Sequence, residues 1–244
     1  MLIINSNHLQ IFETIKTLFL SKTEIPKKDN WKAQTNNDLW LKVITQVIAV
    51  GSSTPVNRFN ERPDLMHQVS YNELLAIESQ DELVCTINHV LRAVGARYAS
   101  ADISKCRKTK ALAYNLTVFK GFKDGPKELL MTLSELKGKN SDQQQIRYLM
   151  KMFKYMQSKS ARDYLMELGL VQNAIALDVR IRTILTKAGI NVPKGFENNH
   201  RLYDQIENDV LNHICIPLDL SGVALDRMLY QNYDDILKML NKSY

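Results

Sequence analysis

Two side chains in one stretch of this sequence could carry out chemistry together: the amine of Lys159 and the carboxylate of Asp178. Lys159 opens a predicted helix that Gly169 closes, and Asp178 stands where its side chain can cap the next helix. A helix N-terminus carries partial positive charge and backbone N–H groups that suit phosphate. If the two helix starts converge, one site holds an amine nucleophile and an ionised carboxylate. Taken singly, such a lysine is usually a solvated surface residue and such an aspartate a cap.

The elements that must position these residues are predicted to be helices. Only nine glycines and six prolines interrupt 244 residues, and apolar residues recur at spacings of three and four. The sequence contains no convincing strand-like alternation. We therefore predict an all-α fold of about ten helices.

Capping residues and the apolar pattern give the expected helix limits. Asp38 is predicted to cap a buried central helix that runs through Val50 and is closed by Gly51. A capping box from Ser70 to Glu73 is predicted to start another helix. Further starts are expected near Ser104, at Ser141, at Lys159 and at Val179.

Charge is distributed unevenly along the chain. The formal net charge is +6, yet residues 103–162 carry 14 Lys and Arg against four acids, which are Asp124, Glu128, Glu135 and Asp142. Phosphate contacts by Lys and Arg supply most non-specific affinity for nucleic acid, so this region indicates a polyanion-binding face. Solvated helix faces that happen to be basic would give the same count.

The cysteines and the apolar runs limit the class of protein further. Cys85, Cys106 and Cys215 lie far apart, without zinc or iron–sulfur ligand spacing and without an even disulfide set. The N-terminal residues lack a signal-peptide pattern, and no apolar run is long enough for a membrane span. The sequence thus predicts no metal site, no membrane association and a reducing compartment.

The segment that contains Lys159 and Asp178 resembles a known family. Lys159-Ser160-Ala161 is followed by Ala176-Leu177-Asp178, nineteen residues from lysine to aspartate. These residue types and their spacing resemble those of the helix-hairpin-helix DNA glycosylase superfamily. The resemblance is to its bifunctional 8-oxoguanine DNA glycosylase/AP lyases without an iron–sulfur cluster in particular. Residues 38–54 resemble the buried helix and loop that begin the family's barrel, and Lys108-Thr109-Lys110-Ala111 resembles the start of a later barrel helix.

The resemblance implies two helical subdomains with a cleft between them. A six-helix barrel that includes the helix-hairpin-helix region is expected over residues 35–170, and residues 1–34 with 171–244 are expected to form the second subdomain. The hairpin departs from the family at Tyr155 and Gln157, which stand where two glycines are usual. These residue types do not favour a left-handed glycine turn.

The resemblance also implies an activity, the removal of an oxidised base from DNA, with 8-oxoguanine as the expected lesion. Lys159 is expected to attack C1′ of the sugar and form a Schiff base that leads to β-elimination, while Asp178 stabilises the cationic sugar. Base recognition is expected to include the segment around Tyr230 and Gln231. DNA contacts are expected from the loop of Gly51, Ser52 and Ser53 and from the hairpin residues Tyr155, Gln157, Ser158 and Ser160.

The implied chemistry requires no metal and no organic cofactor. The expected partner is double-stranded DNA that contains a damaged base, bound by a monomer in the cytoplasm at the nucleoid, or in the nucleus of a eukaryote. Other functions stay open from the sequence. They are a glycosylase for oxidised pyrimidines, a non-catalytic helix-hairpin-helix DNA-binding protein, and a helical protein whose basic face contacts an acidic partner.

Overall fold

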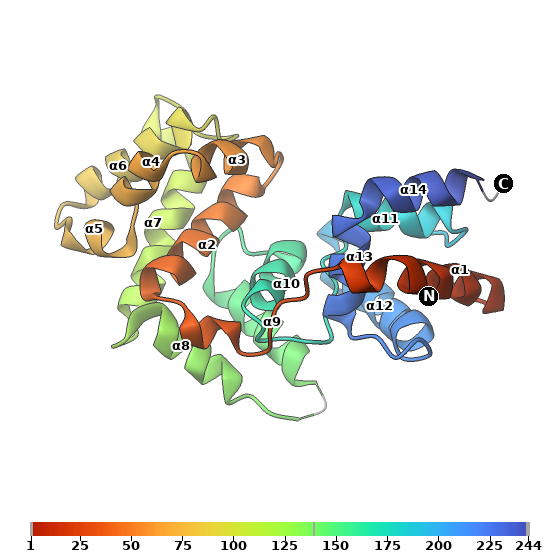
Figure 1. Ribbon diagram of the computed structural model, residues 1–244. Coiled ribbons are helices and arrows are strands. Elements are labelled where there is room, and N and C mark those ends of the chain that lie inside the picture. Colours follow the sequence, from red (N-terminus) through yellow and green to blue (C-terminus); the bar gives the residue numbers. More distant parts are fainter. Residues whose placement is uncertain (1, 139, 243–244) are drawn as a thin grey trace. The chain divides into compact units, whose positions relative to one another are not determined.

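The computed structural model describes residues 2–138 and 140–242, and within them every regular element is a helix (Figure 1). The predicted all-α class is confirmed. In the described residues, no helix combines the length and the apolar character that crossing a membrane requires.

The chain divides into two units, Met1–Lys28 with Leu165–Tyr244, and Asp29–Tyr164. The sequence-based boundaries lie at residues 35 and 170. The unit Asp29–Tyr164, called the central unit below, contains η2 (Asn30–Ala33), α2 (Asn36–Ala49), α3 (Thr54–Asn60), α4 (Pro63–Gln68), α5 (Tyr71–Ala76), α6 (Gln80–Ala93), η3 (Ile103–Lys105), α7 (Arg107–Lys120), α8 (Gly125–Ser134), α9 (Ser141–Met152) and the first residues of α10 (Ser158–Glu167).

The other unit, called the terminal unit below, joins both ends of the chain. It contains α1 (Ser6–Phe19), η1 (Leu20–Lys22), α11 (Val179–Lys187), η4 (Phe196–Asn198), α12 (His200–Val210), the π-helix η5 (Leu211–Cys215), α13 (Gly222–Gln231) and α14 (Tyr233–Lys242).

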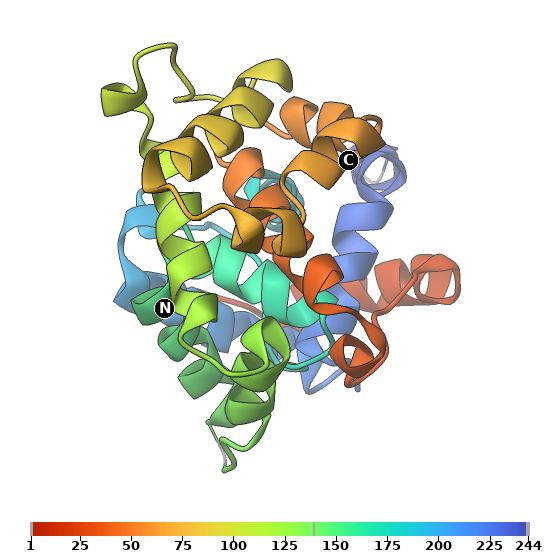
Figure 2. The same cartoon turned by 90° about the vertical axis from the view of Figure 1, so that its left-hand side faces the viewer.

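Helix α2 is the core helix of the central unit and contacts α3, α5, α7 and α8 (Figure 2). Its Trp40 is fully buried, and the centroid of its ring lies 6.5 Å from the ring centroid of Tyr71 and 6.0 Å from that of Phe119. The indole Nε1 donates to the carbonyl of Val69 at 2.9 Å. Because burial and a satisfied N–H fix this ring, Trp40 is a core residue rather than a surface for stacking bases.

The start of α2 corrects the predicted cap. Thr35, not Asp38, is the N-cap: its hydroxyl accepts from Asp38 N at 3.1 Å, and the Asp38 carboxylate accepts from Thr35 N at 2.8 Å. Asp38 therefore fills the third helical position of a capping box. Its hydrogen bonds from the Thr35 hydroxyl and backbone N–H lower the pKa of Asp38.

Two other predicted starts also change. Helix α5 begins at Tyr71 after Ser70, but no side-chain capping hydrogen bond forms there, so the predicted capping box is wrong. The Tyr71 N–H instead donates to Asn37 Oδ1 at 2.9 Å. The helix expected near Ser104 is a short 3₁₀ turn at that position, and α7 proper starts at Arg107.

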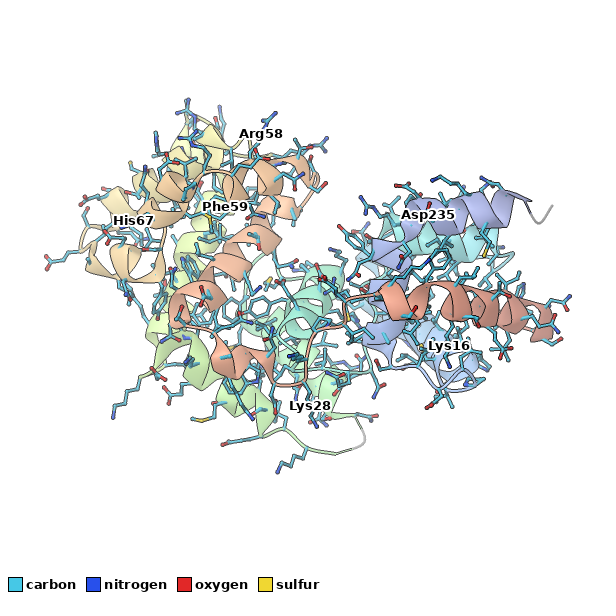
Figure 3. All side chains as sticks on the ribbon, viewed as in Figure 1. Lys16, Lys28, Arg58, Phe59, His67 and Asp235 are labelled. Carbon is cyan, nitrogen blue, oxygen red and sulfur yellow. The ribbon has the colours of Figure 1, made fainter. Side chains whose placement is uncertain are left out.

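The terminal unit buries one face of α1 against α11–α14. Phe12, Ile15 and Phe19, at helical spacing, belong to the same apolar cluster as residues of α11, α12, α13 and α14. On another side of α1, the amine of Lys16 donates to the carbonyl of Leu218 at 2.6 Å (Figure 3). The N-terminal helix is thereby fixed to the C-terminal helices that follow Asp178.

Candidate active site

Lys159 is the second residue of α10, the second helix of a hairpin whose first helix is α9. The turn between the two helices passes through Tyr155, whose φ of 62° is left-handed. Such a conformation costs a non-glycine residue about 1–2 kcal/mol. The turn therefore has the backbone that a glycine would favour although the residue is a tyrosine.

Contacts on both sides hold this turn. Asn115 of α7 binds Lys154 reciprocally: its Oδ1 accepts from Lys154 N at 2.8 Å, and its Nδ2 donates to Lys154 O at 3.0 Å. After the turn, the Ser160 hydroxyl donates to Tyr155 O at 3.1 Å. Burial raises the pKa of the Tyr155 phenol. Neighbouring contacts thus fix the start of α10.

The hairpin residues expected to contact DNA differ in exposure. Gln157 is exposed, Tyr155 is half-buried, and the side chains of Ser158 and Ser160 are buried. The Ser160 hydroxyl accepts from Gln157 N at 3.0 Å. The two serines shape the turn from inside, and contact between this hairpin and DNA stays a prediction.

The amine of Lys159 lies 3.2 Å from Asp163 Oδ2, one helical turn further along α10. The same oxygen accepts from Gln46 Nε2 of α2 at 3.1 Å. The lysine side chain is 42% exposed and the Asp163 side chain 18%. The lysine side chain is therefore partly exposed, and one carboxylate oxygen bonds both its amine and the core helix.

Asp178 is the N-cap of α11, as the sequence predicts. Its backbone is extended, with φ −92° and ψ −177°, and its Oδ1 accepts from Ile181 N at 2.9 Å. The side chain is half-buried. Asp178 belongs to the terminal unit and Lys159 to the central unit.

Buried acids fix the backbone immediately before Asp178. Glu207 accepts from Ile175 N at 2.7 Å, and Asp226 accepts from Ala176 N at 2.8 Å. Both side chains are at least 98% buried. Sequence analysis missed these two positioning residues, and their only signal was an acid at an apolar-facing position of an amphipathic helix.

Aromatic side chains also lie near the start of α11. The guanidinium of Arg180 lies 4.6 Å from the ring centroid of Tyr230 and 5.6 Å from that of Tyr233. The Gln231 amide is occupied by the backbone of Glu24, accepting from its N–H at 2.9 Å and donating to its carbonyl at 2.8 Å. Gln231 thus joins the N-terminal segment to α13, whereas the ring of Tyr230 lies against Arg180.

The loop of Gly51, Ser52 and Ser53 follows α2. Gly51 has φ 91°, and a Cβ there would lie 3.0 Å from the Arg97 side chain. Beneath the loop, the fully buried Lys108 amine donates to the carbonyls of Ile48 at 2.9 Å and Val50 at 2.8 Å. A cation at the C-terminus of a helix satisfies carbonyls that lack helical partners. Lys108 therefore fixes the start of the loop.

The basic region contributes less surface charge than its composition indicates. Lys108 and Arg162 are both fully buried, so neither adds to a phosphate-binding face.

In residues 2–138 and 140–242, no group of three or more His, Cys, Asp and Glu side chains is arranged to hold a metal ion.

Comparison with known proteins identifies the fold. No protein-family model matches the sequence, and no curated protein shows significant sequence similarity to it. Solved structures are similar across more than nine-tenths of the chain, and they are 8-oxoguanine DNA glycosylases. The chain shares their all-α fold.

Three structures define this similarity. The 8-oxoguanine DNA glycosylase of Methanocaldococcus jannaschii has a TM-score of 0.62 and 15% identity, with 93% of this chain and 96% of that chain covered. The Methanocaldococcus jannaschii 8-oxoguanine glycosylase/lyase in complex with a 15mer DNA containing 8-oxoguanine has a TM-score of 0.61 and 15% identity, with 93% of this chain and 97% of that chain covered. The Thermotoga maritima 8-oxoguanine DNA glycosylase has a TM-score of 0.58 and 19% identity, with 91% of this chain and 86% of that chain covered. At these identities the similarity establishes the fold.

Lys108 makes a testable contribution to stability. Burial, with a smaller effect of the Arg97 charge, lowers its pKa from 10.5 to about 8. Between these values the unfolded chain binds more protons than the folded chain, so this group makes the free energy of unfolding rise with pH. In urea unfolding, Lys108→Met is expected to show a smaller rise than the unsubstituted protein across this interval. Lys110→Met, which removes an exposed amine of the same helix, is the control, and equal pH dependence of all three proteins would contradict the assignment.

Proposed function

We propose that this protein is a DNA base-excision repair glycosylase with AP lyase activity that removes 8-oxoguanine from double-stranded DNA. The observation that carries the proposal is a partly exposed lysine at the start of the second helix of a hairpin, in a chain with the fold of 8-oxoguanine DNA glycosylases. The aspartate at the start of α11, at the spacing that the resemblance implies, supports it. We infer that the protein acts as a monomer at the DNA of the nucleoid, or in the nucleus of a eukaryote.

The proposed reaction begins with extrusion of the damaged nucleotide, because a base stacked in a duplex cannot be reached by a side chain. The loop of Gly51, Ser52 and Ser53 would occupy the gap that the nucleotide leaves. The hairpin from Tyr155 to Ser160 would contact the phosphate backbone through its exposed edge at Gln157.

Lys159 then supplies the nucleophile. The ammonium that is paired with Asp163 first gives up a proton to solvent, and the neutral amine attacks C1′. The glycosidic bond breaks with its electron pair leaving on the base, which takes up a proton. The nitrogen then loses two protons, one balanced by the proton that the base takes up and one by the proton that the ring oxygen O4′ takes up as its bond to C1′ breaks. This gives a Schiff base between Nζ and C1′. Loss of the C2′ proton expels the 3′ phosphate and cuts the strand. Asp178 stabilises the positive charge that develops on the sugar as the base departs.

The nucleophile is tested with Lys159→Gln, which removes the amine and keeps a side chain of similar length. We expect borohydride trapping on a duplex that contains 8-oxoguanine to give a covalent adduct with the unsubstituted protein and none with Lys159→Gln. Lesion binding is expected to persist, because the amine is needed for attack rather than for docking.

Borohydride trapping on duplexes that contain different lesions decides between the alternative functions. An adduct at full yield in Lys159→Gln would identify another amine as the nucleophile. Binding of lesion DNA without any adduct in the unsubstituted protein would indicate a non-catalytic DNA-binding protein. Trapping only on duplexes with oxidised pyrimidines would identify the protein as a glycosylase for oxidised pyrimidines.

Asp178→Asn separates electrostatic catalysis from capping. Asparagine caps a helix about as well as aspartate, so the thermal midpoint is expected to change little. The substitution removes the negative charge that faces the sugar cation, and loss of a well-placed electrostatic group costs on the order of 10²-fold in rate. Single-turnover base excision is therefore expected to fall by about that factor.

The control for this variant is Asp178→Ser, another good cap without charge. Both variants are expected to keep the fold and to lose excision together. Near-normal excision in either folded variant would reduce Asp178 to a helix cap.

A further inference from the structure

Two polar side chains, Asp163 of α10 and Gln46 of α2, form a hydrogen-bonded chain that ends at the Lys159 amine. Asp163 Oδ2 accepts from Lys159 Nζ at 3.2 Å and from Gln46 Nε2 at 3.1 Å. Gln46 is 93% buried in α2, far from α10 in sequence. One carboxylate oxygen therefore connects the amine of a partly exposed lysine to a buried amide of the core.

Helix stability does not require this arrangement. A lysine in the first turn of a helix opposes the macrodipole, and an i,i+4 pair with the lysine nearer the N-terminus has the less favourable orientation. The lysine side chain of the pair is 42% exposed, and an ion pair that solvent screens stabilises a fold little. The buried Gln46 amide donates to the Asp163 carboxylate and so restrains the ion pair. A restrained amine matters for chemistry rather than for folding.

We propose that Asp163 is a positioning residue that holds the Lys159 amine for attack, and that Gln46 orients Asp163. The inference rests on the proposed role of Lys159 as nucleophile. A lysine side chain has four flexible bonds, and fixing its end before DNA binds removes part of the entropy lost on reaching the reactive geometry. Asp163 acts through Lys159 and needs no contact with DNA.

The test uses a duplex with an abasic site, whose aldehyde condenses with an amine whatever lesion the protein prefers. The amine adds to the C1′ aldehyde, water leaves, and borohydride reduces the imine to a stable secondary amine. Asp163→Asn keeps the shape of the side chain and removes its charge. At saturating protein, the trapping rate is expected to fall about 10- to 100-fold, the loss typical of a misplaced reactive group. Affinity for the duplex is expected to be unchanged.

Gln46→Met and the double variant test the order of the three residues. Gln46→Met leaves the ion pair and is expected to slow trapping less than Asp163→Asn. Because Gln46 acts only through Asp163, the double variant is expected to be no slower than Asp163→Asn alone. Independent, additive losses would contradict the proposed sequence of contacts. If Asp163→Asn lowers the thermal midpoint, Gln46→Met alone carries the test, and an unchanged trapping rate in this variant would then overturn the proposal.

The matched control is Asp235→Asn on α14, which breaks the exposed Asp235–Lys238 ion pair of 2.9 Å (Figure 3). It is expected to trap at the full rate. A full rate in folded Asp163→Asn would overturn the positioning role while the nucleophile stands. Absence of any adduct in the unsubstituted protein would overturn the proposed function and this inference with it.

Discussion

The left-handed turn at Tyr155 is the constraint on which the proposed site depends. It sets where α10 begins, and thus where the amine of Lys159 emerges from the hairpin. A tyrosine does not prefer this backbone, so other contacts must hold it. The reciprocal hydrogen bonds between Asn115 and Lys154, with the Ser160 hydroxyl on Tyr155 O, provide that hold. A strained residue that persists because its surroundings fix it is typical of functional sites.

The terminal unit solves a similar problem with buried carboxylates. Burying an acid is costly unless hydrogen bonds compensate, and the backbone N–H groups of Ile175 and Ala176 supply such bonds to Glu207 and Asp226. The chain before α11 is thereby fixed, and Asp178 reaches its capping position with an extended backbone. In both units, buried polar groups fix the backbone from which a proposed catalytic side chain extends.

Local sequence signals predicted the helices and the cap at Asp178, because capping chemistry and apolar periodicity act over a few residues. They failed where several polar residues compete. Thr35 and Asp38 both suit an N-cap, and only the backbone path decides that Thr35 takes it. At Ser70 the residue types of a capping box are present, but its side-chain hydrogen bond does not form.

Long-range contacts left no signal in a single sequence. Gln46 and Asp163 are 117 residues apart, and nothing in either segment indicates that they meet. Likewise, the residue type at Tyr155 argues against the turn that Asn115 of α7 helps to impose. Lys108 was counted with the basic surface, although the helix-end carbonyls it binds are brought to it only by the packing of α2 against α7.

The central claim is that the Lys159 amine forms the covalent bond with the sugar. The most direct measurement is mass spectrometry of the borohydride-reduced adduct formed with an 8-oxoguanine duplex, after proteolysis of the protein and digestion of the DNA. The account predicts one modified peptide, with the sugar remnant on Lys159. A remnant on another amine, such as the neighbouring exposed Lys154, would contradict it.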